Sequence, residues 1–439
     1  MAADLRQDSA LSRLNFPRRL SLAAVIVIAP AQHLRAQSDQ PLTLAVARDA
    51  AQRNSPIITV AREAVTVARA RERQAGALAN PTLSYGREQT SGADQANAQD
   101  IASLDQPIEL GLRSLRRDAA RARREAAEAR LALAQAEVDH DVTVAYARAV
   151  AADQRARIAE QAAGAFTRAV RVSEQRLAAG DVAGYAHRRL RLEAARMATA
   201  RAEAALAALS ARVALKSLIA GPEGSITPPG IVLSDSLILP GEVPAADSSV
   251  ALATRFRAEL RALASEAAAA AADARLVARE RIPVPVVSAG LKSERVEQPG
   301  AGAQSLGGFI VGVSLPLPLF DRRGGATQAA EAEARRQLAL LGDQRRRVAQ
   351  EVLEAHAAYA AAREQLMLLG PAVNADAGAA IAAADVAYAE GEITLAEWLD
   401  VLRAYREAQA SYATLQAEVL IRRAALERAV GAPLTTLSR

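Results

Sequence analysis

Apolar and polar positions repeat with the period of an α-helix along two very long stretches of the chain. From Leu112 to Ala179, leucine, valine and alanine recur at helical spacing without a proline. At 1.5 Å per residue, this run predicts one continuous helix about 100 Å long. The run from 322 to 390 has the same pattern and is interrupted at Gly370-Pro371, where we expect a kink. Rods of this length do not fit a single compact globular domain.

Shorter helical stretches precede both rods, over residues 43–79 with a break near Pro56, and over 250–281 without a break. Between each short stretch and its rod we expect two strands, separated by polar loops at 88–100 and 292–307. The odd positions of 309–319 are all large and apolar, a period of two over eleven residues that is typical of a membrane-spanning barrel strand. Its lipid-facing side would carry Phe309, Val311, Val313 and Leu315.

A half-buried strand of a soluble sheet shows the same alternation and is commoner in general. No other strand-rich region exists in this sequence to complete such a sheet. Since the smallest known membrane barrels have eight strands, four strands per chain cannot close one alone. Two copies would give eight strands and a filled interior, whereas three would give twelve and a lumen.

The chain repeats its own pattern at offsets of 204 to 211 residues, with landmarks in the same order in both copies. The matched pairs are Pro81–Gly86 with Pro285–Gly290, Gln106–Leu110 with Leu315–Leu319, and Ala179–Val182 with Glu390–Ile393. The expected organisation is a signal peptide at 1–36, a first repeat at 37–220 with a strand pair at about 82–110, a linker at 221–249, a second repeat at 250–431 with a strand pair at about 284–319, and a tail at 432–439. The predicted fold class is mainly α with membrane β: a tandem repeat of long antiparallel coiled-coil helices plus four transmembrane strands.

Composition and charge support close helix packing and export. The 439 residues include 110 alanines and no cysteine, and only 3% are aromatic, so helix axes can approach closely and no disulfide contributes to stability. Residues 1–36 have basic residues up to Arg19, an apolar stretch over 20–29 and a small residue at Ala36, which is typical of a secretory leader. These residues carry five arginines and two aspartates, so the rest of the chain has a net charge of only +2. This near neutrality disfavours nucleic acid as a partner.

No sequence feature indicates catalysis. The chain lacks the nucleophile elbow, the zinc-protease motif, the phosphate loop and the dinucleotide fingerprint. His140, His187 and His356 lie far apart in the sequence, and His33 falls in the leader. We therefore expect no enzyme activity, no cofactor and no metal site.

The residues that carry these patterns resemble the TolC family of outer-membrane efflux proteins, from about Leu42 to Gly431. The resemblance rests on Leu42–Leu44, on Ala79–Ser84 entering the first strand, on Leu315–Asp321 leaving the fourth, and on Gly391–Leu395 before the last helix. It implies a homotrimer, a twelve-stranded β-barrel in outer-membrane lipid, and an α-barrel extending into the periplasm. It also implies docking to a periplasmic adaptor (membrane fusion) protein and an inner-membrane pump.

By this resemblance the chain is the passive outer-membrane channel of a tripartite efflux system, with metal ions, drugs and secreted protein all open as substrates. The alternative is a periplasmic coiled-coil adaptor or scaffold protein. Such an adaptor should carry one helical hairpin flanked by compact β domains, whereas this chain has two strand pairs and two hairpins in tandem. The channel is therefore favoured.

Two acidic residues near the start of the last helix are candidates for a pore constriction. Glu397 and Asp400 lie three apart, off a heptad seam that includes Trp398 and Tyr405, and would form rings of negative charge in a threefold assembly. Aligned from Gly391, they fall on the family's constriction acids. Acids near a helix N-terminus also stabilise its dipole without any pore role.

The same alignment places two further gate positions of the family. Tyr388 falls on a tyrosine that the family uses in closing the gate. The family's gating arginine falls on Ile393 here, so a salt-bridge latch from that position is not expected.

The turns of the two long hairpins are candidate adaptor-docking tips: Gly180 and Asp181 in the first repeat, Gly391 and Glu392 in the second. A glycine there is equally explained as a helix stop. The arginines that follow the outgoing strands are expected at the lipid head groups or, alternatively, at solvated helix starts. They are Arg113, Arg116, Arg117, Arg322 and Arg323.

Overall fold

The computed structural model describes residues 41–92, 96–221, 232–233, 241–298, 302–373 and 377–434, and residues 41–439 cluster into one compact unit. The first repeat contains α1 Leu44–Asn54, α2 Pro56–Ala75, β1 Thr82–Ser91, β2 Ala96–Pro107, α3 Leu112–Ala179 and α4 Gly184–Ile219. The second contains α5 Ala246–Phe256, α6 Ala258–Arg279, β3 Val286–Gln298, β4 Gly302–Ser314, α7 Gly324–Pro371, α8 Ala377–Glu390 and α9 Leu395–Val430. The predicted leader, most of the linker and the last five residues of the tail lie outside the described residues.

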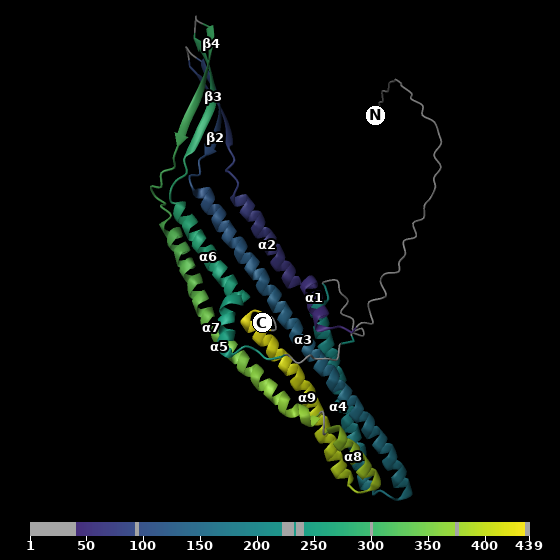
Figure 1. Cartoon of the computed structure of the whole chain (residues 1–439). Helices are drawn as coiled ribbons and strands as arrows, with labels where there is room; N and C mark the ends of the chain where they lie inside the picture. Colours follow the sequence, from purple (N-terminus) through teal and green to yellow (C-terminus); the bar gives the residue numbers. More distant parts are fainter. Residues whose placement is uncertain are drawn as a thin grey trace, which may run out of the picture. The chain divides into compact units, whose positions relative to one another are not determined.

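Both long helical runs are present. The helix expected from Leu112 to Ala179 is confirmed as α3, and α7 ends at Pro371, next to the expected kink. Helix α3 packs against α2 and α6 along one part of its length and against α4 and α9 along another (Figure 1). No described helix is both long and apolar enough to cross a bilayer.

Each repeat breaks its first helical stretch at one extended residue, Ser55 in the first and Arg257 in the second. The break at Ser55 was expected from Pro56, but the expectation of an unbroken helix over 250–281 was wrong. At the second break, the backbone of Gly431 approaches Arg257 so closely that a Cβ on Gly431 would lie 2.4 Å from the Arg257 Cα atom. Such contacts between residues far apart in sequence leave no local signal.

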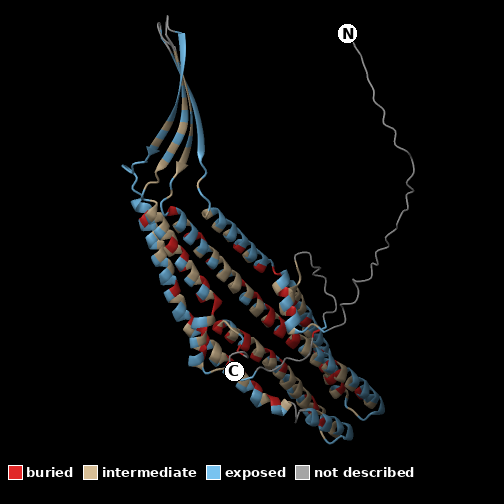
Figure 2. Cartoon of the chain, turned by 45° about the horizontal axis from the view of Figure 1, so that its top comes forward, coloured by how far each residue is buried: buried red, intermediate tan, exposed pale blue. Residues whose placement is uncertain are grey.

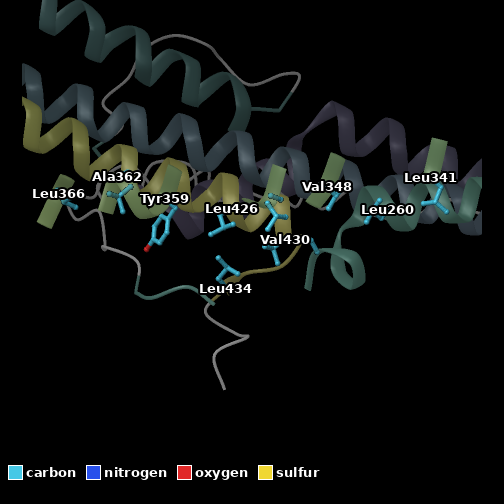
Figure 3. Close-up of a cluster of buried hydrophobic side chains, with 13 residues drawn as sticks. Leu260, Leu341, Val348, Tyr359, Ala362, Leu366, Leu426, Val430 and Leu434 are labelled. Carbon is cyan, nitrogen blue, oxygen red and sulfur yellow. The ribbon is translucent and has the colours of Figure 1, made fainter. Parts of the chain in front are cut away.

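Two clusters of buried apolar side chains stabilise the helices, one in each repeat. The first joins α1, α2, α3 and α4, and the second joins α5, α6, α7 and α9. Tyr146 and Tyr359 occupy matching places, since each hydroxyl donates a 2.9 Å hydrogen bond to the carbonyl of a residue that precedes the short first helix, Leu42 or Gly241. In the second cluster the labelled side chains follow one another along the helices in a row (Figure 3).

Small residues form the seam between the repeats. Ala147 and Ala151 of α3 pack against Ala417 of α9, and all three are buried. Alanine allows this close approach because its side chain adds little bulk to the helix surface. The abundant alanine of the sequence is thus used where the helices of the two repeats meet.

The four strands form one antiparallel sheet in the order β1-β2-β3-β4. The expected polar loops were wrong, because β1 continues to Ser91, β2 starts at Ala96 and pairing between β3 and β4 extends to Gln298 and Gly302. The expected strand end at 319 was also wrong. Strand β4 stops at Ser314, because Pro316 and Pro318 have no N–H to donate, and Leu315 lies one residue beyond the strand.

Candidate functional site

The strand register gathers apolar side chains on one face of the sheet. Val311, Ala289, Leu104 and Leu83 form one cross-strand row, and Phe309, Leu291, Ala102 and Tyr85 form the next. Val313 and Val287 continue the same face toward the helices. Val311 and Val313 have 69% and 72% of their surface exposed, so no described part of the chain covers this apolar face.

The opposite face consists mostly of small or polar residues. Its central row is Ser84, Ser103, Gly290 and Ile310, and the next toward the helices is Thr82, Asp105, Ser288 and Gly312. Exposure alternates along β3: odd, apolar-face positions are exposed and even, polar-face positions are partly covered, as the banding of the strands shows (Figure 2). This arrangement, apolar outside and polar inside, is that of a membrane barrel wall.

Both edges of this sheet lack a partner strand within the described residues, because β1 and β4 are its outermost strands. An open edge carries unpaired N–H and C=O groups, which cannot be left unsatisfied in hydrocarbon. A bilayer-spanning form of the sheet therefore needs strands from other copies.

The turns predicted to form the hairpin tips have the same backbone structure in both repeats. Gly180 and Gly391 both have φ of +82°. The Asp181 N–H donates to the Arg176 carbonyl at 2.9 Å, and the Glu392 N–H donates to the Ala387 carbonyl at 2.8 Å. These are Schellman turns, in which only glycine fits the left-handed position without strain.

The two tips lie side by side at one end of the helices (Figure 1). The Arg176 guanidinium, at the end of α3, donates a 3.1 Å hydrogen bond to the Ala389 carbonyl, at the end of α8. Asp181 and Glu392 are both exposed. The tips thus present two acidic side chains and two glycine turns together.

Behind the second tip, an aromatic cluster fixes the start of α9. Trp398 is buried, stacks on Tyr388 at 5.1 Å between ring centroids, and its indole N–H donates to Asp385 at 2.7 Å. The ring of Phe166, on α3, lies 6.0 Å from the Trp398 ring between centroids, and Ile393 packs against the cluster. The predicted gate residue Tyr388 is therefore part of the packing between α3, α8 and α9.

Glu397 and Asp400 lie on the same part of α9, and both are exposed. Glu397 completes a capping box: its Oε2 accepts from the N–H and the hydroxyl of Thr394, both at 2.8 Å. These two bonds, the backbone one first, hold the pKa of Glu397 below its usual value. Asp400 has 71% of its side chain exposed and makes only a long 3.4 Å contact to Arg403. Glu397 thus caps the helix, and Asp400 has its charge largely free.

One ion pair near the tips was missed by the sequence analysis. Glu193 of α4, only 5% exposed, accepts from Arg403 of α9 at 2.6 Å and from Arg196 of its own helix at 3.2 Å. It joins the second hairpin helix of one repeat to that of the other. The two residues lie 210 positions apart, and nothing in their local sequence distinguishes them from other charged helix positions.

The described residues contain no group of three or more His, Asp or Glu placed to hold a metal ion. His187 is buried against Ser173, with 3.3 Å between its Nδ1 atom and the serine oxygen, and the His356 Nε2 atom lies 3.1 Å from the Pro244 carbonyl. These histidines have packing contacts in separate parts of the molecule.

The second repeat, residues 250–432, matches the family model described as outer membrane efflux protein. The second repeat is thus similar to the outer membrane efflux proteins. The expected family and its location, the outer membrane with an extension into the periplasm, are thereby confirmed, and the family is one of channels, not enzymes. No curated protein matches the sequence.

Solved channel structures share the fold of this chain over 89% of its length. The Campylobacter jejuni CmeC outer membrane channel has a TM-score of 0.72 at 16% identity, with 86% of that chain covered. Vibrio cholerae VceC, an outer membrane protein, has 0.69 at 19% identity and 96% coverage. CusC, solved in a study of transmembrane channel formation, has 0.70 at 18% identity and 92% coverage. The predicted fold class, long helices plus membrane β, is confirmed.

Proposed function

We propose that three copies of this outer membrane efflux protein close one twelve-stranded barrel and form a passive conduit across the outer membrane and periplasm. One observation carries the proposal: the four-stranded sheet has an exposed apolar face, a polar opposite face and two open edges. Joining β4 of one copy to β1 of the next satisfies both edges. Three copies leave a lumen, whereas two would give a filled eight-stranded barrel.

The conduit serves, on this proposal, a tripartite efflux system. The channel itself is passive on this proposal. An inner-membrane pump supplies the energy, and a periplasmic adaptor connects pump and channel. The competing role of periplasmic adaptor or scaffold is disfavoured by the uncovered apolar sheet face, which a soluble protein would have to bury.

The edge pairing can be tested with introduced cysteines, because the chain has none of its own. One cysteine replaces Leu83 on β1, and the second replaces Phe309, Val311 or Val313 on β4 in separate variants. At least one pair should oxidise in outer membranes to give a product of three linked chains on a denaturing gel. If no pair links chains, or linkage stops at two, the edge-to-edge barrel is contradicted.

We propose that Glu397 and Asp400 form the narrowest, cation-selective ring of the conduit, with Tyr388 as part of the gate. Both acids are exposed near the tip end of α9, and Tyr388 packs directly on the helix that carries them. Three copies would bring six carboxylates to one level of the pore. Such rings select for cations and bind multivalent cations.

The constriction is best tested by removing charge without removing the cap. In Glu397→Gln with Asp400→Asn, glutamine still closes the capping box, so a change in conduction reports the charge alone. We expect weaker block by a multivalent cation and lower cation selectivity in planar bilayers. The matched control replaces the exposed Glu364 and Glu407 by Gln, which changes the same net charge outside the predicted ring. If a multivalent cation blocks the ring variant and the wild type equally, these acids do not form the constriction.

We also propose that the two tips dock the adaptor, through Gly180 and Asp181 in one repeat and Gly391 and Glu392 in the other. Their exposure and their adjacency support a shared docking surface. Asp181→Arg with Glu392→Arg should abolish cross-linking to the adaptor and leave conductance of the isolated channel unchanged. Unaltered cross-linking would mean that the glycines are only helix stops.

A further inference from the structure

The connection from the sheet to the long helix differs between the two repeats. Four residues, 108–111, separate β2 from α3, whereas nine residues, 315–323, separate β4 from α7. The longer connection carries Leu315, Leu317, Leu319 and Phe320, all exposed, and Phe320 has 100% of its surface exposed. An added apolar segment that none of the described residues covers calls for another partner.

A cavity of about 420 Å³ lies between this connection and the segment that leads from α6 into β3. Ile282, Pro283 and Val284 line it from one side, and Pro316, Leu317 and Pro318 from the other. These side chains have no hydrogen-bonding groups. The cavity walls are therefore suited to an aliphatic ligand or part of one.

The rim of the cavity is basic. Arg281, Arg322 and Arg323 line it together with Glu280 and Asp321. Arg323 is already used: its guanidinium pairs with Glu280, and its backbone N–H donates to Asp321 at 2.8 Å. No described residue pairs with the guanidinium of Arg281 or Arg322, and both residues are exposed. Two free guanidinium groups beside an apolar cavity can each donate paired hydrogen bonds to a phosphate.

The first repeat has no equivalent of this site. At the strand-entry offset of 204, Ala77 stands in the place of Arg281, and at the strand-exit offset of 209, Arg113 stands in the place of Arg322. The Arg113 guanidinium donates to the Gly76 carbonyl at 2.7 Å. Chain geometry at the junction does not need an arginine in the place of Arg281, since the first repeat makes the same passage with an alanine there. The combination of Arg281 with an unpaired Arg322 is therefore specific to the second repeat and its longer connection.

The cavity also lies at the level where the apolar face of the sheet ends. Val313 and Val287 form the last apolar row of the strands. The cavity residues lie just beyond this row: 282–284 come shortly before β3, and 316–318 come shortly after β4. In an outer-membrane protein this level is occupied by head groups of the leaflet that faces the periplasm. Arginines within this zone attract anionic lipid.

We propose that this cavity binds one anionic glycerophospholipid per chain, with its phosphate on Arg281 and Arg322. The glycerol and the first acyl carbons contact Ile282, Val284 and Leu317. The inference goes beyond the proposed conduit, and depends only on the placement of the sheet in the outer membrane. A second copy of the chain covering the same surface is the main competing occupant.

Native mass spectrometry of the protein extracted from outer membranes and stripped of lipid tests the proposal. The probes are palmitoyl-oleoyl phosphatidylglycerol and phosphatidylcholine with the same acyl chains. The wild type should bind up to one phosphatidylglycerol per chain, about tenfold or more tightly than phosphatidylcholine, because two guanidinium contacts favour the anionic lipid. Arg281→Gln with Arg322→Gln should lose this preference.

The matched control is Arg171→Gln with Arg345→Gln, which removes the same charge at exposed positions that pair with no described residue. This control should keep the preference. Equal binding of the two lipids by the wild type, or an unchanged preference in the Arg281/Arg322 variant, overturns the proposal. Displacement of the lipid by millimolar inorganic phosphate would identify a simple anion site and also overturn it.

The mass of the assembly separates this proposal from the proposed function. A wild-type trimer without a lipid preference contradicts the lipid site alone, and a wild-type monomer contradicts the conduit. Loss of the trimer in the Arg281/Arg322 variant would show that a neighbouring copy occupies the cavity, which overturns the lipid assignment.

Discussion

Single residues on the strands determine which face meets lipid, because adjacent positions point to opposite sides of the sheet. Val311 lies in the middle of three apolar rows, flanked by those of Phe309 and Val313. An arginine there would place a charge near the centre of the hydrocarbon. We expect Val311→Arg to destabilise the membrane-inserted protein by about 2 to 4 kcal/mol, measured by urea unfolding in lipid vesicles.

The control for this prediction changes the other face. Ser288 lies on the polar face opposite Gly312, so Ser288→Arg adds the same side chain where water is expected, at a cost below about 1 kcal/mol. If both variants lose equal stability, or if Val311→Arg assembles normally, the orientation of the sheet is wrong.

A half-buried histidine gives a pH dependence. His140 of α3 lines a cavity of about 190 Å³ with Asp139, Glu427 and Arg428, and its Nδ1 atom is buried without a partner among the described residues. Burial first, and the charge of Arg428 second, lower the pKa of His140 from 6.5. The unfolded chain therefore binds this proton more readily, so stability is lost as pH falls through the ordinary histidine range.

Asp139 acts in the opposite direction, because burial raises its pKa from 3.8. Its protonation favours the folded state, and therefore partly offsets the loss at lower pH. We expect His140→Gln to flatten the fall in unfolding temperature between pH 7.5 and 6, measured in detergent. An identical slope in variant and wild type would contradict a neutral, buried His140.

At the scale of elements, one glycine sets the distance between α9 and the break at Arg257. Gly431 has φ of +80°, and a Cβ there would lie 2.4 Å from the Arg257 Cα atom. Gly111, before α3, has φ of +74°, and a Cβ added to it would have no atom within 4 Å. Gly111→Ala should cost about 1 to 2 kcal/mol for the backbone conformation alone, and Gly431→Ala about 1 to 3 kcal/mol more.

Chemical unfolding of both variants separates the cost of the left-handed backbone from the cost of the packing clash. Both positions have the left-handed backbone, and only Gly431 has atoms close to the added Cβ. Equal losses of stability would show that the contact between Gly431 and Arg257 is not a constraint on the fold.

Elements with a strong local period were predictable from the sequence, and elements that depend on distant contacts were not. Helix α3 runs over the residues that the apolar period and the absence of proline predicted. The break at Arg257 lies against Gly431, 174 positions later, and no proline marks it locally. The polar ends of β1 and β2 had the composition of a loop, but their backbone pairing continues from Arg87 and Asp100 to Ser91 and Ala96.

The candidate sites divide in the same way. The tips were predictable because a glycine after a long apolar period is a local helix stop, and both turns have the expected left-handed glycine. The pair of Glu193 with Arg403 could not be predicted, because it forms only when α4 packs near α9. The capping role of Glu397 was visible as Thr394 three residues before it, although the pore prediction drew on the family resemblance instead.

At the scale of the whole molecule, the exposed apolar face and the two open edges of the sheet make the single chain incomplete. Helical packing alone would give a stable soluble bundle, with a buried cluster in each repeat. The sheet is stable only where lipid covers one face and further strands pair with both edges. Oligomerisation and membrane insertion are therefore coupled in this account.

The most direct test is the mass of the cross-linked chain, measured separately in the outer-membrane and soluble periplasmic fractions. Closure by three copies predicts a product of three chains confined to the outer membrane, and no cross-linked product in the soluble fraction. A soluble monomer or dimer would contradict the closed barrel, and would leave the periplasmic scaffold as the function of these hairpins.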